Sequence, residues 1–146
     1  IKMVEIALRA ISPGINDPNT AIDCIRFLRT PLTEALQNAS EYVVFYNKNK
    51  VPRLMKRQEG IEQLLYTTFY QLSYYGRQDI SILFAVLDTL SHIAEHSRQE
   101  VKLEIAKFGQ YVVRKFQHDL LEELDRKQLN KKLEKLESNC KKNIFP

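Results

Sequence analysis

The sequence predicts an all-α protein, a bundle of about six helices without a significant sheet. Glycine and proline are scarce, at 4 and 5 of 146 residues, and no proline lies between Arg53 and Phe145. A β-sandwich or barrel needs turn residues roughly every 8 to 12 positions, so this spacing favours long helices. Apolar residues also recur at helical spacing along most of the chain. The length and the 44% of hydrophobic residues are typical of one folded domain, which we place at residues 1–146.

Two proline-containing turns organise the N-terminal part. A first helix over residues 3–11 is predicted to end at Ser12-Pro13-Gly14, because proline disfavours the helical conformation of the residue before it. Asn16-Asp17-Pro18 then starts a second helix. The Asp17 carboxylate can accept hydrogen bonds from free backbone N–H groups, and Pro18 suits the first helical position.

The apolar stripe of this second helix keeps its phase from Ala21 to position 42 or 43. Pro31 therefore either kinks one long helix or opens a new helix that Thr30 caps. The periodicity fails between Asn47 and Glu59, which predicts one long connection, and residues 51–55 within it suit an extended conformation.

Three stripes follow in the C-terminal half. The first begins at Ile61 and ends near Gly76, where glycine can take the left-handed conformation that closes a helix. Asp79 is the predicted cap of the next helix. The string Ser97-Arg98-Gln99-Glu100 matches the capping box S-x-x-E, and a regular amphipathic helix runs from Val101 to Phe116.

A last helix is predicted to begin with Asp119 as its cap and to carry leucines from Leu121 to Leu136. Its end fades into a frayed tail at residues 139–146. This gives six helices, or seven if Pro31 separates two.

Charge and cysteine content restrict the class of protein. The net charge of +4 lies in residues 97–146, where 12 Lys and Arg face 8 Asp and Glu. These basic residues alternate with acidic ones along helices, so we interpret them as solvated helix faces and expect no nucleic-acid partner. Cys24 and Cys140 are too few and too far apart for a zinc site or disulfide framework, which favours a reducing compartment. No apolar run of about 18 residues exists to cross a membrane.

Signatures of enzymes are missing from the sequence, so we expect no catalytic activity and no cofactor. The four glycines stand too far apart for a phosphate-binding loop, and no serine lies in a G-x-S-x-G motif. His92 and His96 have the i, i+4 spacing of a metal-binding pair, but we interpret them as unrelated surface histidines and predict no metal site. His118 is interpreted as a helix-end residue. Four tyrosines between residues 66 and 75 are interpreted as packing with a polar rim rather than as a base-stacking surface.

The turn between the first two helices is the candidate ligand site. Its polar side chains lie at a helix start, where free N–H groups and the helix dipole favour anions. Asp17 would already occupy part of that positive end, so we favour a rigid corner in which Arg9 pairs with Asp17. The alternative is a binding site for a small ligand or anion, formed by Arg9, Ser12, Asn16, Asp17, Asn19 and Thr20.

The string ALRAISPGINDPNTA, residues 7–21, resembles the signature of a family of bacterial predicted integral membrane proteins, domain-of-unknown-function family 2254. A second similarity covers residues 64–94, so that the resemblance extends over most of residues 3–96. Pro31 departs from the family's uninterrupted helix.

The resemblance implies that the chain, which begins with Ile1 in a helical pattern, is the soluble C-terminal part of a longer protein of the cell membrane. The excess of Lys and Arg and the unpaired cysteines favour its cytoplasmic side. It supplies no activity. We therefore predict an assembly or regulatory domain of a channel, transporter or scaffold, with its own transmembrane region and identical copies as partners. The stripe from Val101 to Phe116 or the leucines from Leu121 to Leu136 would form the contact face.

Overall fold

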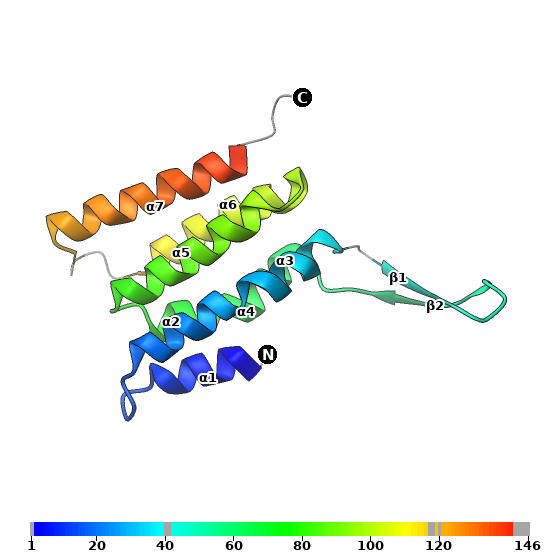
Figure 1. Cartoon of the computed structure of the whole chain (residues 1–146), viewed down its shortest axis with the longest axis horizontal. Helices are drawn as coiled ribbons and strands as arrows, with labels where there is room; N and C mark the ends of the chain where they lie inside the picture. The colour runs from blue at the N-terminus through cyan, green and yellow to red at the C-terminus, as the bar shows by residue number, and fades with distance from the viewer. Residues whose placement is uncertain (1, 40–41, 117–118, 120, 142–146) are drawn as a thin grey trace.

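The computed structural model describes residues 2–39, 42–116, 119 and 121–141. Within these residues the chain forms seven α-helices and one two-stranded antiparallel hairpin (Figure 1). The all-α class predicted from the sequence is confirmed, and the hairpin is the departure from it in the described part of the chain. The elements are, in chain order, α1 Lys2–Ala10, α2 Pro18–Phe27, α3 Arg29–Gln37, β1 Tyr42–Tyr46, β2 Pro52–Arg57, α4 Ile61–Tyr75, α5 Ile80–Glu95, α6 Gln99–Lys115 and α7 Glu123–Lys141.

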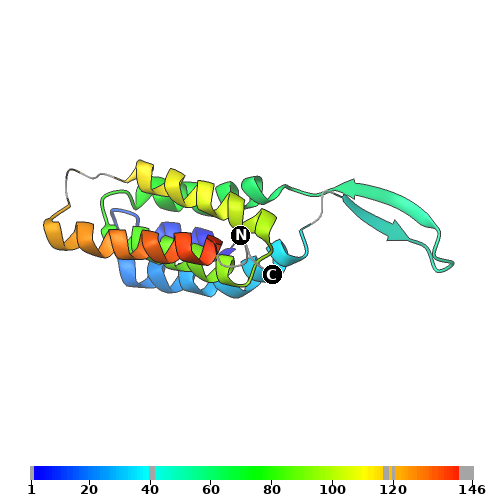
Figure 2. The ribbon, with the colours of Figure 1, turned by 90° about the horizontal axis from the view of Figure 1, so that it is seen from above.

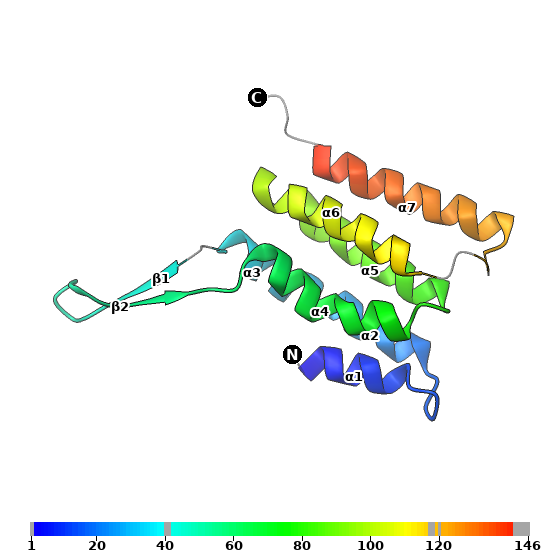
Figure 3. The same ribbon diagram turned by 180° about the vertical axis from the view of Figure 1, so that it is seen from behind.

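Helix α5 forms the centre of the bundle. Its sequence, ISILFAVLDTLSHIAE, is apolar on nearly all sides, and such a helix is stable only when other elements surround it. It contacts α2, α3, α4, α6 and α7, whereas α1 packs against α2 and α4. The helices lie side by side, with α7 and α1 at opposite edges of the bundle (Figures 1 and 3).

The two predicted aspartate caps are confirmed. The Asp17 side chain accepts a hydrogen bond from the backbone N of Thr20 at the start of α2. The Asp79 side chain accepts one from the backbone N of Ser81 at the start of α5, over 2.9 Å. Each carboxylate thus pairs with an N–H group that has no partner inside its helix.

The break in the long second stripe lies at Leu28 rather than at Pro31. Leu28 keeps helical dihedral angles, φ −71° and ψ −13°, and no side chain caps α3, so the alternative in which Thr30 caps a new helix is wrong. Pro31 lies in the first turn of α3. Backbone N–H groups in a first turn have no acceptor within their own helix, so a proline there costs no helical hydrogen bond. Helix α3 ends at Gln37, so the predicted extension to position 42 or 43 is also wrong.

Gly76 closes α4 in a way the sequence did not predict. Its φ is −86°, which is not the left-handed conformation. The glycine is needed because of its surroundings: a Cβ would lie 2.6 Å from Cγ2 of Ile82 and 2.8 Å from the carbonyl oxygen of Leu72. The small residue therefore permits the close approach of α4 and α5.

The capping predictions for α6 and α7 are wrong. Ser97 is buried and its hydroxyl donates to the carbonyl oxygen of Ile93, over 2.6 Å, so that it completes the end of α5 instead. Arg98 takes the N-cap position of α6 without a side-chain hydrogen bond. Helix α7 begins at Glu123, which is too far along the chain for Asp119 to cap it.

The last helix is anchored at its C-terminal end. Asn139 and Cys140 are buried, and the Asn139 amide donates to the carbonyl oxygen of Ser91 at 3.1 Å and to its hydroxyl at 3.0 Å. The predicted fraying is therefore wrong for residues 139–141, because burial and these bonds order the final turn. Residues 142–146 of the predicted tail lie outside the described residues.

A hairpin projects from the end of the bundle where α3 ends and α4 begins (Figures 1 and 2). Strand β1, YVVFY, consists of the β-branched and aromatic residues that favour extended structure. The Asn47 side chain closes the turn by accepting hydrogen bonds from the backbone N of Asn49 at 3.0 Å and of Val51 at 2.9 Å. We call residues 42–57 the arm.

Candidate functional site

The predicted ligand corner between α1 and α2 is built around Asp17. One carboxylate oxygen accepts from the Thr20 backbone N at 3.1 Å, and the other accepts from the Thr20 hydroxyl at 2.6 Å. These hydrogen bonds, first that from the Thr20 side chain, lower the pKa of Asp17. The carboxylate therefore carries the negative charge that the start of α2 attracts, in the place a bound anion would take.

The other corner residues complete a tight turn. The Ser12 hydroxyl donates to the carbonyl oxygen of Arg9 at 2.6 Å, and Asn16 has the left-handed φ of 50°. Asn19 and Thr20 are exposed on the first turn of α2. Among the described residues Arg9 is exposed and forms no ion pair with Asp17, so the predicted pairing is wrong. The local contacts are those of a rigid corner; ligand binding by these six residues stays a prediction.

The histidine pair forms a local contact. The rings of His92 and His96 are 4.7 Å apart, and Nδ1 of His96 lies 2.9 Å from the carbonyl oxygen of His92. Burial, then the nearby His96, lowers the pKa of His92. In the part of the chain that the structure describes, no group of three His, Cys, Asp or Glu is placed to hold a metal ion. His118 lies outside the described residues.

Three of the four tyrosines of α4 are exposed, and Tyr70 is half-buried between two of them. Tyr66 and Tyr70 stack with their ring centroids 4.8 Å apart, and Tyr74 meets Tyr75 edge to face at 5.1 Å. Tyr66, Tyr74 and Tyr75 are all more than 40% exposed, whereas Phe69 on the same helix is fully buried. Packing in this helix is therefore supplied by Phe69 and its apolar neighbours, and the tyrosines mainly cover the surface.

The faces predicted to bind a partner lie inside the bundle. The predicted stripe on α6 belongs to the core, as do Leu121, Leu129 and Leu136, whereas Leu103 of the same helix lies off the stripe and is 55% exposed. Leu124 is the exposed exception in this leucine series, at 67%. The expectation that α6 or α7 presents a free apolar face is wrong, because α5 needs both helices to cover it.

The arm is the apolar surface that the sequence prediction missed. Val43 pairs with Lys56 and Phe45 with Leu54, so these four side chains share one face, while Val44 and Met55 share the other. Several apolar residues of the arm, on both faces, are exposed by 43% or more: Tyr42, Phe45, Tyr46, Val51, Leu54 and Met55. A hairpin that buries so little of its own apolar surface is a candidate contact element.

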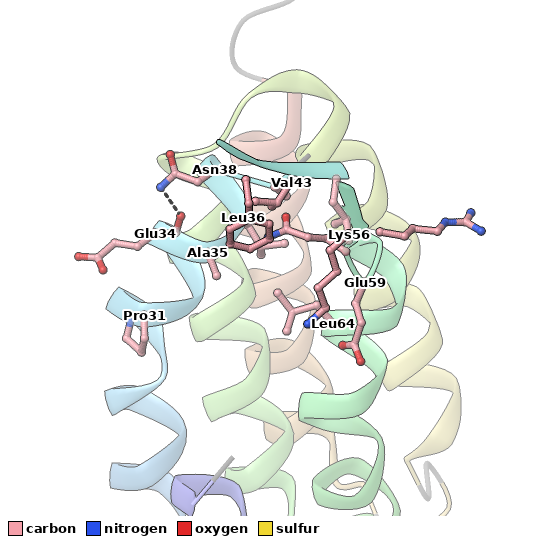
Figure 4. Close-up of a pocket in the computed structure, with 14 residues that line it drawn as sticks. Pro31, Glu34, Ala35, Leu36, Asn38, Val43, Lys56, Glu59 and Leu64 are labelled. Atoms are coloured by element: carbon pink, nitrogen blue, oxygen red, sulfur yellow. Dashed lines mark hydrogen bonds between the residues drawn. The ribbon is translucent and has the colours of Figure 1, made fainter. Parts of the chain in front are cut away.

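An open hollow of about 870 Å³ lies at the base of the arm, between α3, α4 and one face of the hairpin (Figure 4). Val43 and Lys56 of the arm face Leu36 and Leu64 of the bundle across it. Its rim carries charges of both signs, which define no single ligand chemistry. The hollow therefore marks where the arm leaves the bundle.

A signal for the arm is present in the sequence. The apolar run YVVFY and the run VPRLM are separated by an Asn-containing turn, which is a hairpin pattern. The helical stripe of the second helix conceals this pattern, because Val43 also fits the helical phase. The extended conformation predicted for residues 51–55 is confirmed in β2.

In the described residues, the fold and sites define an all-α domain with a projecting arm. The chain belongs to the family described as "Predicted membrane protein (DUF2254)", whose model matches residues 1–92. It is 30% identical over 141 residues to an uncharacterized protein of Mycobacterium bovis and to one of Mycobacterium tuberculosis. These alignments cover 86% of this chain but 24% of each relative, so the chain spans about a quarter of their length.

No solved structure gives a significant match to the chain. Within the residues that the structure describes, every helix is too short or too polar to reach across a bilayer.

Proposed function

We propose that this chain is an assembly or regulatory domain of a bacterial membrane protein of the channel, transporter or scaffold type, and not an enzyme. It lies outside the bilayer beside the membrane-embedded part of its own protein, and the arm is its contact element on the membrane side. The observation that carries the proposal is the contrast between a closed bundle, whose helices bury their apolar faces in one core, and an arm that leaves its apolar residues exposed.

The membership in a predicted membrane protein family supports this placement. The free thiols of Cys24 and Cys140 support the cytoplasmic side, where cysteines stay reduced. The corner at Asp17 supports a structural role for the turn between α1 and α2, because its charge is already paired with the helix start.

Oxidative footprinting of the arm tests the proposal. Met55 and Tyr46 are 65% and 62% exposed in this chain, so hydroxyl radicals should modify both rapidly in the isolated 146-residue chain. In the full-length protein in its membrane, contact should slow the modification of both residues severalfold.

Leu124 supplies the matched control. It is 67% exposed at the start of α7, at the end of the bundle away from the arm (Figure 1). Its modification rate should be the same in the two preparations. Equal rates for Met55 and Tyr46 in both preparations would show that the arm contacts nothing, and the proposal would be lost.

A further inference from the structure

We propose that the arm binds the surface of an anionic phospholipid bilayer, with its basic side chains at the headgroup phosphates and its apolar side chains at the boundary of the acyl chains. This inference rests on the proposed function, since it names what the arm contacts. The observation behind this inference is that the arm has exposed apolar side chains on both faces and carries basic but no acidic residues.

The charge of the arm is of one sign. Residues 42–57 include five Lys or Arg and no Asp or Glu. Lys48, Lys50, Arg53 and Lys56 are exposed, and no ion pair in the described part of the chain involves any of them. The excess of basic residues after residue 97, by contrast, alternates with acidic residues. An anionic surface is therefore complementary to the arm and not to the rest of the molecule.

The distribution of apolar residues on the arm favours the interfacial layer of a bilayer over a rigid protein surface. Phe45 and Leu54 lie on one face of the ribbon, and Val44 and Met55 on the other. A rigid protein surface covers one face of a ribbon, whereas the interfacial layer of a bilayer surrounds a shallowly inserted element. Tyr46, near the turn, is suited to this layer because its ring is apolar and its hydroxyl is polar.

Two other occupants fit less well. A second copy of the arm would bring ten like charges together along two strands, which opposes pairing between arms. A nucleic acid would attract the charges but offers no apolar layer for Val44, Leu54 and Met55. Both occupants become outcomes of the test.

Vesicle co-sedimentation of the 146-residue chain tests the inference. We expect binding to vesicles of phosphatidylglycerol and phosphatidylcholine, and at least tenfold weaker binding to phosphatidylcholine alone. Binding should weaken in 0.5 M salt, because salt screens exposed charges. The triple variant Lys48→Gln, Arg53→Gln, Lys56→Gln should bind about a hundredfold more weakly, at about fivefold per basic residue near the surface.

A matched variant controls for net charge. Lys127→Gln, Lys131→Gln and Lys135→Gln remove the same charge from exposed positions of α7 and should leave vesicle binding unchanged. Leu54→Ser with Met55→Ser should also weaken binding, whereas Phe27→Ser with Leu124→Ser, which are equally exposed on the bundle, should not. Equal effects of the arm and α7 charge variants would overturn the inference.

The two proposals fail in different ways. If Met55 is protected in the full-length protein but the chain does not bind the anionic vesicles, the arm contacts protein, and only the lipid inference is lost. Binding to a single-stranded oligonucleotide in place of vesicles, or arm-dependent dimers in place of vesicle binding, overturns it as well. If Met55 is unprotected in the full-length protein, the proposed function itself is wrong.

Discussion

Asp17 couples the stability of the corner to pH. Its hydrogen bonds to Thr20 lower its pKa in the folded chain below the ordinary value of 3.8. A carboxyl group with a lowered folded pKa stabilises the fold above its unfolded pKa, and this contribution is lost as the pH falls through the folded value.

Replacing Asp17 should therefore have a pH-dependent cost. We expect Asp17→Ala to lower the urea midpoint at pH 7 and the difference from the unaltered chain to shrink below pH 3. Asp17→Asn, which can still cap α2, should lose less at pH 7. Asp23→Asn, on the exposed surface of the same helix, is the control. A deficit of Asp17→Ala that is equal at both pH values would contradict the charge-based account.

Gly76 provides a test of packing between α4 and α5. Gly76→Ala should destabilise the chain by about 1–3 kcal/mol, because the new methyl group meets the backbone of Leu72 as well as Ile82. Gly14→Ala, where nothing lies within 4 Å, should stay within about 0.5 kcal/mol of the unaltered chain. Chemical denaturation of the two variants checks both values, and equal stabilities would refute the steric argument.

At the scale of elements, α7 is joined to α5 by polar contacts as well as by leucines. The Lys132 ammonium lies 2.8 Å and 2.7 Å from the two carboxylate oxygens of Asp88, about halfway along α7. The buried Asn139 amide bonds to Ser91 near the end of the same helix. These contacts fix the register of a helix that carries more charged than apolar residues.

The Asn139 contact should be the stronger of the two, since it is buried. Asn139→Ala should cost about 1–3 kcal/mol, because it removes both hydrogen bonds from the buried amide to Ser91. Asn130→Ala, on the exposed side of α7, should be neutral or slightly stabilising, because alanine is the better helix former. Thermal unfolding followed by circular dichroism measures both, and a neutral Asn139→Ala would show that leucine packing alone holds α7.

The elements differ in how well the sequence predicted them. Apolar periodicity located the helices, and the aspartates placed two of their starts correctly at Asp17 and Asp79. The sequence around Ser97 is compatible with two roles: an N-cap of α6, or a hydroxyl that bonds to the last turn of α5. Only the tertiary structure shows that the second role is the real one. The arm was missed because Val43 satisfies the helical period and the strand period at once.

At the scale of the whole molecule, the candidate contact surface was not predictable from periodicity. An amphipathic stripe such as Val101 to Phe116 shows that a helix has an apolar face, but not whether that face is covered. The answer depends on α5, which is apolar all around and recruits α6 and α7. Once that core is closed, the arm is left as the exposed apolar element described above.

Self-association of the domain stays a prediction. We expect the 146-residue chain to form a dimer or larger oligomer at high concentration, as measured by light scattering. Leu54→Ser with Met55→Ser should not change the mass, because like charges keep the arms apart. A monomeric mass at every concentration would contradict the expected oligomer.

Because both cysteines are buried, the rate at which a thiol reagent modifies them reports local opening of the fold. Cys24 lies in α2 and Cys140 at the end of α7, so the thiols sample two separate regions of the fold. Burial raises the pKa of both thiols, which keeps them in their less nucleophilic, protonated form. The alkylation rate at each position therefore measures how often α2 or α7 opens away from the core, without any introduced label.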